Sequence, residues 1–240
     1  GAVMSISQEI WRSRSLWSEL RLAVCCAVLM LKNIVYNFSG QGFSIVAAVV
    51  GLPFALRFFG PEGFGLLSLA MSFVNAAGVL DLGLGRSSAK FVAERSSKGN
   101  MLGACRVIWA SLFVQLALGL VAVVLYFYFG PLIVGMFNLV SISSASALRI
   151  GGIVVLTFPF TLVNGVLRGG LEGRSFFGAV NIAKVIQNGS LYFLPAACGA
   201  LGFTVEKTVI LLAASRLIVT LFYIAIYLFR VPEFRNISIT

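Results

Sequence analysis

The protein has 240 residues, of which 59% are hydrophobic and only 11% are charged. A water-soluble domain usually carries about 25% charged residues, so this composition excludes one and indicates a membrane protein. The formal net charge is +10, but the 18 lysines and arginines are spread between long apolar segments. This distribution is typical of positively charged cytoplasmic loops, so no nucleic-acid partner is expected.

The amino-terminal residues 1–33 are predicted to form a cytoplasmic and interfacial segment. Up to residue 21, apolar and charged residues are mixed as in a short helix that lies in the membrane surface. The short apolar run Leu22–Leu31 follows, and no small-residue cleavage site closes it. This favours an extension that leads into the first membrane span over a signal peptide.

Six transmembrane helices are predicted over residues 34–230. Each apolar segment has about the length that crosses the hydrocarbon core at ~1.5 Å per residue, and kinks are expected at Pro159 and Pro195. Gly130-Pro131 is predicted to end the third helix, and residues 231–240 form a tail. The predicted bounds are about 34–58, 63–82, 107–129, 150–167, 176–201 and 209–229.

The lysines and arginines predict the orientation of these helices. Apart from two that lie inside spans, nearly all precede the first span, follow the sixth, or lie between spans two and three or four and five. The opposite side carries only Arg57, Arg149 and Lys207. Because cytoplasmic loops are enriched in positive charge, both termini are predicted to be cytoplasmic in a multi-pass protein.

The segment Leu56–Gly99 combines several of these features. An apolar run turns at Gly60-Pro61-Glu62, where proline suits the first helical position and glutamate suits the first turn of a helix. The charge-free run Gly63–Leu80 comes next, followed by a group of cations. We therefore predict a helical hairpin with its basic end inside the cell; the cations are Arg86, Lys90, Arg95 and Lys98.

Two strings in this segment, FFGPEGFGLLSLA and VLDLGLGRSSAKFVAE, resemble the first hairpin of lipid-linked oligosaccharide flippases. These form the polysaccharide transporter, or Wzx-type, family, within the superfamily that also holds multidrug and toxin exporters. The resemblance implies an all-α polytopic membrane protein, with this chain as a six-helix bundle matching the amino-terminal half of a 12–14 helix flippase. It also implies a bacterial inner-membrane transporter for undecaprenyl-diphosphate-linked oligosaccharides, as used for O-antigen, lipopolysaccharide and exopolysaccharide biosynthesis.

Two cations, Lys184 and Arg216, lie inside predicted spans. Each stands nine residues from the nearest charged or polar boundary, which places both ~14 Å deep. An unpaired cation there costs at least ~2.5–3.5 kcal/mol, so each should face a wet cavity or a partner. Since no acid is expected at this depth, we predict that both line one lumen and attract the diphosphate of the lipid carrier.

Polar side chains at helical spacing accompany these two cations. Rows spaced by three or four residues place polar groups along one side of a helix, where they can line a cavity or form the hydrogen bonds that hold membrane helices together. The further candidates for the cavity are Asn181, Asn188, Asn164, Asn75 and Gln41.

Asp81 is predicted at the cytoplasmic end of the second span, where two roles are open. An intramembrane acid can relay protons and couple transport to an ion gradient. The local sequence favours a structural role, in which Asp81 shapes the turn before Gly83 and Gly85 or neutralises Arg86.

The chain carries no recognisable catalytic or metal site. It has no histidine, and its four cysteines lie inside apolar runs without metal-ligand spacing, as expected of small membrane hydrophobes. No nucleophile–base set or pair of intramembrane carboxylates is visible. We therefore expect a protein that is not an enzyme and that needs no cofactor or metal.

Three functions remain open from the sequence. The first is flipping of lipid-linked oligosaccharides, and the second is export of drugs or cations, which should require carboxylates facing the cavity. The third is a membrane scaffold subunit of a polysaccharide-synthesis complex, without transport. Besides membrane lipids, the expected partner is a second copy in a homodimer or a carboxy-terminal half that completes the bundle.

Overall fold

The computed structural model of the chain divides into two units, residues 1–41 and 42–240, and describes the second one. The described residues are 42–74, 78, 81, 83–135 and 143–234. Within these ranges the chain is helical apart from short turns, and no strand occurs. The predicted all-α class is confirmed.

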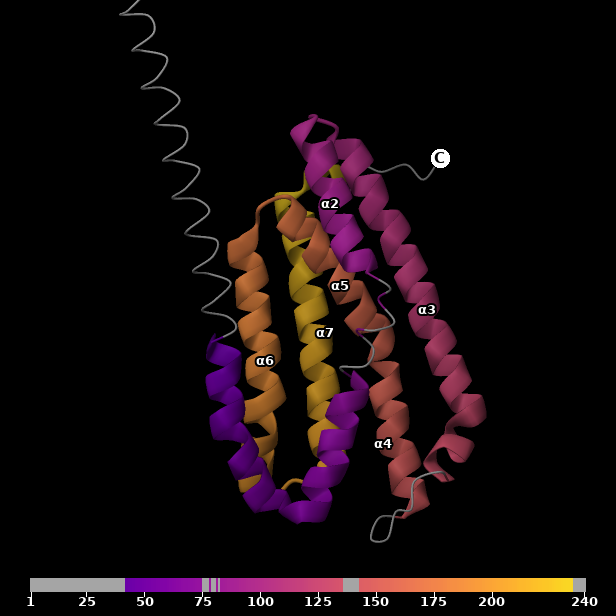
Figure 1. Cartoon of the computed structure of the whole chain (residues 1–240), viewed down its shortest axis with the longest axis vertical. Coiled ribbons are helices and arrows are strands. Elements are labelled where there is room, and N and C mark those ends of the chain that lie inside the picture. The colour runs from indigo at the N-terminus through magenta and orange to yellow at the C-terminus, as the bar shows by residue number, and fades with distance from the viewer. Residues whose placement is uncertain (1–41, 75–77, 79–80, 82, 136–142, 235–240) are drawn as a thin grey trace, which may run out of the picture. The chain divides into compact units, whose positions relative to one another are not determined.

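The helices run roughly along one direction (Figure 1). An amino-terminal hairpin, Gly42–Val74, comes first and is followed by a short α2 and a long α3. The remaining helices and a final 3-10 turn complete the unit. Their bounds are α2 Leu84–Ser97, α3 Met101–Gly135, α4 Ser144–Leu156, α5 Phe158–Gly173, α6 Phe177–Ala200, α7 Val205–Arg230 and η1 Pro232–Phe234.

The amino-terminal hairpin reverses at Gly60, as the sequence predicts. Gly60 has a φ of 68°, a left-handed conformation that side chains with a Cβ rarely adopt, and Figure 1 shows two arms joined at this end. The first arm packs closely on α6, since a Cβ on Gly51 would lie 2.4 Å from the carbonyl oxygen of Tyr192. The second arm buries Leu67 and Met71 in a core cluster with α4 and α7.

The basic segment after the hairpin is a helix, α2, that packs against the bundle, and its cytoplasmic location stays a prediction. The helical arm predicted to reach residue 82 ends at Val74 among the described residues, and α2 begins at Leu84. Small residues allow α2 to pack tightly beside α5, because a Cβ on Gly169 would lie only 2.1 Å from the Gly85 carbonyl oxygen. Arg86 therefore stands on a packed helix.

Proline affects the helices differently at three positions. α3 continues through Pro131 to Gly135, so the predicted end of a helix at this proline is wrong. Close to Pro159, the expected irregularity is present as a break at Thr157 between α4 and α5, with proline in the first turn of α5. Pro195 lies within the continuous α6.

Four helical stretches in the described part of the chain are long and apolar enough to cross a membrane: the hairpin Gly42–Val74, Met101–Leu132 of α3, Ser144–Gly173 across α4 and α5, and Val205–Arg230 of α7. Large apolar side chains on their outer faces remain exposed, for example Phe113 and Phe127. Such surfaces suit contact with lipid, and the chain is a multi-pass membrane protein. The division into six spans stays a prediction. α6, which carries a row of polar residues, is not among these four stretches.

Candidate functional site

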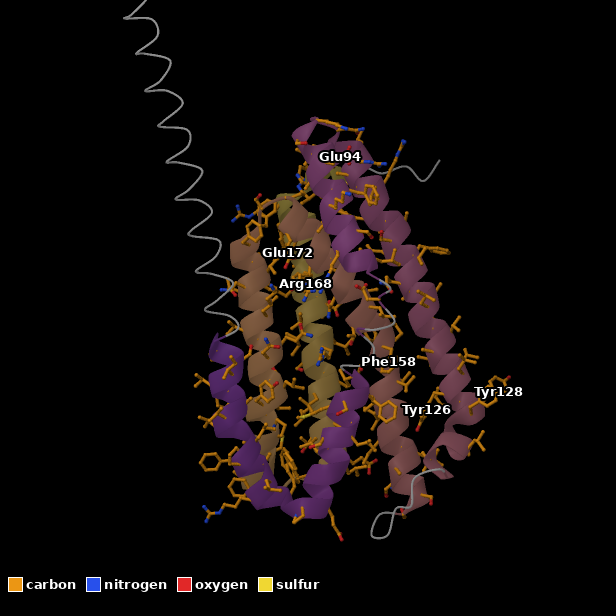
Figure 2. All side chains as sticks on the ribbon, in the orientation of Figure 1. Glu94, Tyr126, Tyr128, Phe158, Arg168 and Glu172 are labelled. Atoms are coloured by element: carbon orange, nitrogen blue, oxygen red, sulfur yellow. The ribbon has the colours of Figure 1, made fainter. Side chains whose placement is uncertain are left out.

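A polar cavity of about 390 Å³ lies within the bundle. α2, α5, α6 and α7 contribute to its wall, together with the turn that precedes α2. Figure 2 shows Arg168 on α5 in the same half of the bundle as Glu172, away from Tyr126 and Phe158. The polar and charged side chains that line the cavity include Asp81, Arg86, Asn164, Arg168, Gln187 and Tyr223.

The charge of this cavity wall is dominated by two arginines. Arg86 and Arg168 are both exposed and therefore form its accessible rim. Arg168 lies 3.8 Å from Glu172 one turn further along α5, whereas no acid among the described residues pairs with Arg86. Because Asp81 is the one acid in the described wall, the wall favours an anionic ligand group.

Asn164 forms the most deeply buried amide in the wall. Only 5% of its surface is exposed, and neither its Oδ1 nor its Nδ2 has a hydrogen-bond partner among the described residues. The sequence places Asn164 on a polar stripe with Arg168 four residues later, and the structure brings both to the same cavity. This arrangement supports the predicted cavity position of Asn164.

Asp81 lies within the bundle and not at its end, because α2 continues the chain beyond it. Its carboxylate accepts hydrogen bonds from the Gly85 N–H at 3.2 Å and from the side chain of Gln115. Gln115 also donates to the Asp81 carbonyl oxygen at 3.0 Å. These contacts support the structural role predicted from the local sequence, since they hold the start of α2.

Gln115 is a buried polar residue that the sequence analysis missed. It lies on α3, is 0% exposed, and links α3 to the turn before α2 through Asp81. The available signal was an isolated amide in the middle of a charge-free apolar run. Such a residue inside a membrane helix generally has a partner, although its sequence gives no indication of which one.

Lys184 has an acidic partner, which corrects the prediction of a midplane cation without one. Its Nζ lies 3.3 Å from Glu172 Oε1, and α5 extends far enough to carry Glu172 into the bundle. The predicted span ended at residue 167 and left Glu172 in a loop. A lysine side chain can place its charge several ångströms from its own Cα, so depth along α6 did not locate the charge.

Arg216 lies near the middle of α7, as predicted, but faces a different cavity from Arg168. Only 7% of Arg216 is exposed, and no acid among the described residues contacts it. The adjoining cavity measures about 20 Å³, room for roughly one water molecule, and Thr157 and Leu191 line it too. The structure therefore does not bring Lys184 and Arg216 together in one described cavity.

The remaining predicted site residues divide between packing positions and undescribed ones. Asn188 Nδ2 donates to Ser44 Oγ at 2.6 Å and joins α6 to the amino-terminal hairpin, which is the packing role left open by the sequence. Asn181 is half-buried, and its Oδ1 has no hydrogen-bond partner in the described ranges. Gln41 and Asn75 lie outside the described residues.

Comparison with known protein families shows the family to which this chain belongs. Residues 30–240 match the family described as "Polysaccharide biosynthesis protein". The chain belongs to the polysaccharide biosynthesis protein family. This agrees with the resemblance carried by the strings at residues 58–70 and 79–94.

A relative of this chain comes from Shigella flexneri and is described as a "Putative O-antigen transporter". The two sequences are 28% identical over 167 residues, which is 70% of this chain and 40% of the relative. The chain thus spans less than half the length of this relative.

Two solved transporter structures share the fold. One is an outward-facing multidrug resistance MATE family transporter of the MOP superfamily, with a TM-score of 0.67 and 21% identity; the match covers 89% of this chain and 48% of that one. The other is a MOP superfamily transporter from Pyrococcus furiosus, with a TM-score of 0.63 and 22% identity; it covers 89% and 46%. The chain corresponds in fold to about half of each structure.

Proposed function

We propose that the chain forms one half of a transporter that moves lipid-diphosphate-linked oligosaccharides across the bacterial inner membrane for surface polysaccharide synthesis. The observation that carries this proposal is the polar cavity with Arg86 and Arg168 at its rim, inside an apolar bundle of the polysaccharide biosynthesis protein family. The Shigella flexneri relative supports the substrate class, and both termini are proposed to be cytoplasmic.

The rim arginines suit a diphosphate for a chemical reason. A guanidinium group donates a planar pair of hydrogen bonds that matches two phosphate oxygens, and it stays positively charged at all relevant pH values. Arg86 and Arg168 approach the cavity from two helices, α2 and α5, so they can contact one diphosphate from two sides. The polar wall then supplies hydrogen bonds that lipid cannot offer to the sugar.

The proposal is tested by complementation of a flippase-null strain with the protein in the full length that its gene encodes. We expect Arg86→Gln with Arg168→Gln to lower surface polysaccharide by about a hundredfold or more, because two charge-assisted hydrogen bonds of about 1.5–3 kcal/mol each are lost. Arg57→Gln is the matched control, because Arg57 is exposed and lies on the amino-terminal hairpin outside the cavity wall.

The outcome is interpreted together with the amount of each variant in the membrane. Normal polysaccharide display by the double variant at parental protein level would reject the arginine site. If neither the unmodified protein nor any variant at these two positions restores display, although each is present in the membrane in normal amounts, the scaffold function is favoured instead.

Export of cationic drugs is a second candidate, favoured by the one observation that Asp81 lines the cavity. The same wall holds two arginines, and the Asp81 carboxylate already accepts hydrogen bonds from Gly85 and Gln115. A cation would therefore face net positive charge, so the anionic substrate is the better match. Drug susceptibility of the complemented strain distinguishes the two functions.

A further inference from the structure

The side-chain amide of Asn164 is buried without a hydrogen-bond partner among the described residues, which packing alone does not explain. Buried side-chain polar atoms normally have a hydrogen-bond partner, and leaving one without costs about 1–3 kcal/mol in a folded protein. Asn164 leaves both its oxygen and its nitrogen without one among the described residues, at 5% exposure. A leucine would occupy similar space without that cost, so the amide is poised for a ligand in the cavity it lines.

The position of Asn164 relative to the rim narrows the class of ligand. Asn164 stands one helical turn before Arg168 on α5, and therefore about 6 Å from it along the helix axis. A diphosphate held by Arg168 and Arg86 would place the first attached sugar ring at this depth. Gly83, which lines the same cavity, leaves space for a ring, because nothing lies within 4 Å of the point where a Cβ would stand.

The chemistry of an amide selects among the groups of such a sugar. Oδ1 only accepts a hydrogen bond and Nδ2 only donates, and the two atoms lie side by side. A phosphate oxygen can accept from Nδ2 but has nothing to donate to Oδ1. Two neighbouring hydroxyl groups satisfy both atoms at once, because one hydroxyl donates to Oδ1 while the next accepts from Nδ2.

We propose that Asn164 determines specificity by binding a vicinal diol on the sugar attached to the diphosphate. This inference rests on the proposed function, since the lipid diphosphate is what brings the sugar to the cavity. It adds a requirement that the general substrate class does not contain, namely two adjacent free hydroxyl groups on the first sugar ring.

The proposal is tested by binding to the purified protein, in the full length that its gene encodes, with three soluble probes. They are farnesyl diphosphate, farnesyl-diphospho-glucose, and the 3-deoxyglucose analogue, which has no vicinal diol. We expect the unmodified protein to bind the glucose compound on the order of tenfold more tightly than the 3-deoxy analogue, as the loss of one or two hydrogen bonds predicts. Asn164→Leu should abolish this ratio and leave the affinity for farnesyl diphosphate unchanged.

Thr161→Val is the matched control within the same cavity wall, because Thr161 lies on the same helix and its hydroxyl already donates to the Thr157 carbonyl oxygen at 2.9 Å. This variant should keep the glucose-to-3-deoxyglucose ratio. Thermal unfolding of Asn164→Leu adds a second readout: the midpoint should stay level or rise, since the change removes two unpartnered polar atoms.

The results separate this inference from the proposed function. A ratio near one in the unmodified protein, or a ratio that persists in Asn164→Leu, overturns the diol site. So does a strong loss of stability in Asn164→Leu, which would show that the amide has a structural partner. Equal binding of farnesyl diphosphate by the unmodified protein and by Arg86→Gln with Arg168→Gln would instead reject the arginine site of the proposed function.

Discussion

Arg216 is a buried charge without an acidic partner among the described residues. Its guanidinium is almost fully buried in the middle of α7, next to a cavity with room for about one water molecule. The hydroxyl of Thr220, one turn further along α7, donates to the backbone carbonyl of Arg216 at 2.9 Å. The residue therefore incurs the desolvation cost of a charge while no described acid compensates it.

We expect Arg216→Met to raise the stability of the purified protein by about 1–3 kcal/mol, since it removes an unpaired buried charge while keeping a long side chain. Thermal unfolding in detergent measures this change. Arg230→Met, at the exposed end of the same helix, is the control and should change stability by less than about 0.5 kcal/mol.

A gain in stability combined with reduced polysaccharide display would show that Arg216 is retained for transport and not for folding. A destabilised Arg216→Met variant would contradict this interpretation and indicate that the guanidinium has a partner in the folded protein.

The pair of α2 and α5 makes the closest helix contact around the candidate site. Glycines recur at every fourth position of α5 from Gly165 onward, and a Cβ on Gly173 would lie 2.5 Å from the Ala89 carbonyl oxygen. Backbone therefore meets backbone, which brings Arg86 on α2 beside the cavity wall formed by α5.

The contact predicts a large effect from one methyl group. Gly169→Ala should lower the stability of the protein by about 1–3 kcal/mol, because its Cβ would overlap the Gly85 carbonyl oxygen and force the helices apart. Gly178→Ala on α6 is the matched control: nothing lies within 4 Å of the point where its Cβ would stand, and alanine favours a helix by up to about 1 kcal/mol. The thermal unfolding midpoints of the two variants should move in opposite directions.

If Gly169→Ala unfolds at the same temperature as the unmodified protein, α2 and α5 do not pack as closely as described. Transport by Gly169→Ala should fall as well, since a displaced α2 would carry Arg86 away from the cavity.

At the scale of the whole bundle, ion pairs identify which connections share an end. Arg149 at the start of α4 lies 3.3 Å from Glu206 at the start of α7. At the opposite end, Arg174 after α5 lies 3.9 Å from Glu233 in η1. Figure 1 shows the turn of the amino-terminal hairpin at the same end as the start of α4. The starts of α4 and α7 therefore share one end of the bundle, and the end of α5 and η1 share the other, as the lysine and arginine distribution predicts.

The absolute orientation is tested with single cysteines in a background without the native ones. Ser97 is the last residue of α2 and Ser143 immediately precedes α4, and both are exposed; the charge distribution predicts that Ser97 is cytoplasmic and Ser143 periplasmic. A membrane-impermeant thiol reagent added to intact cells should label Ser143→Cys and not Ser97→Cys. The reverse pattern would invert the orientation. Thr240, also predicted to be cytoplasmic, lies outside the described residues.

Local properties were predictable from the sequence because they depend on neighbouring residues. The turn at Gly60 follows from a glycine–proline pair between two apolar runs, and the all-helical class follows from the length and hydropathy of those runs. Asn164 and Arg168 share a cavity because the helical period places residues four apart on one face.

Contacts between distant parts of the chain were decided by the tertiary structure. Glu172 reaches Lys184 only because α5 and α6 pack side by side, and Asp81 lies inside the bundle only because Gly85 lets α2 approach α5. Hydropathy left the segment with Arg86 between two predicted spans, since a charged amphipathic helix lowers the average hydropathy of its window. Hydropathy and helical period describe one segment at a time, whereas burial and charge pairing depend on which segments meet. For that physical reason the sequence predicted the helices and several of the polar residues, and the packing of helices selected which of them form the cavity.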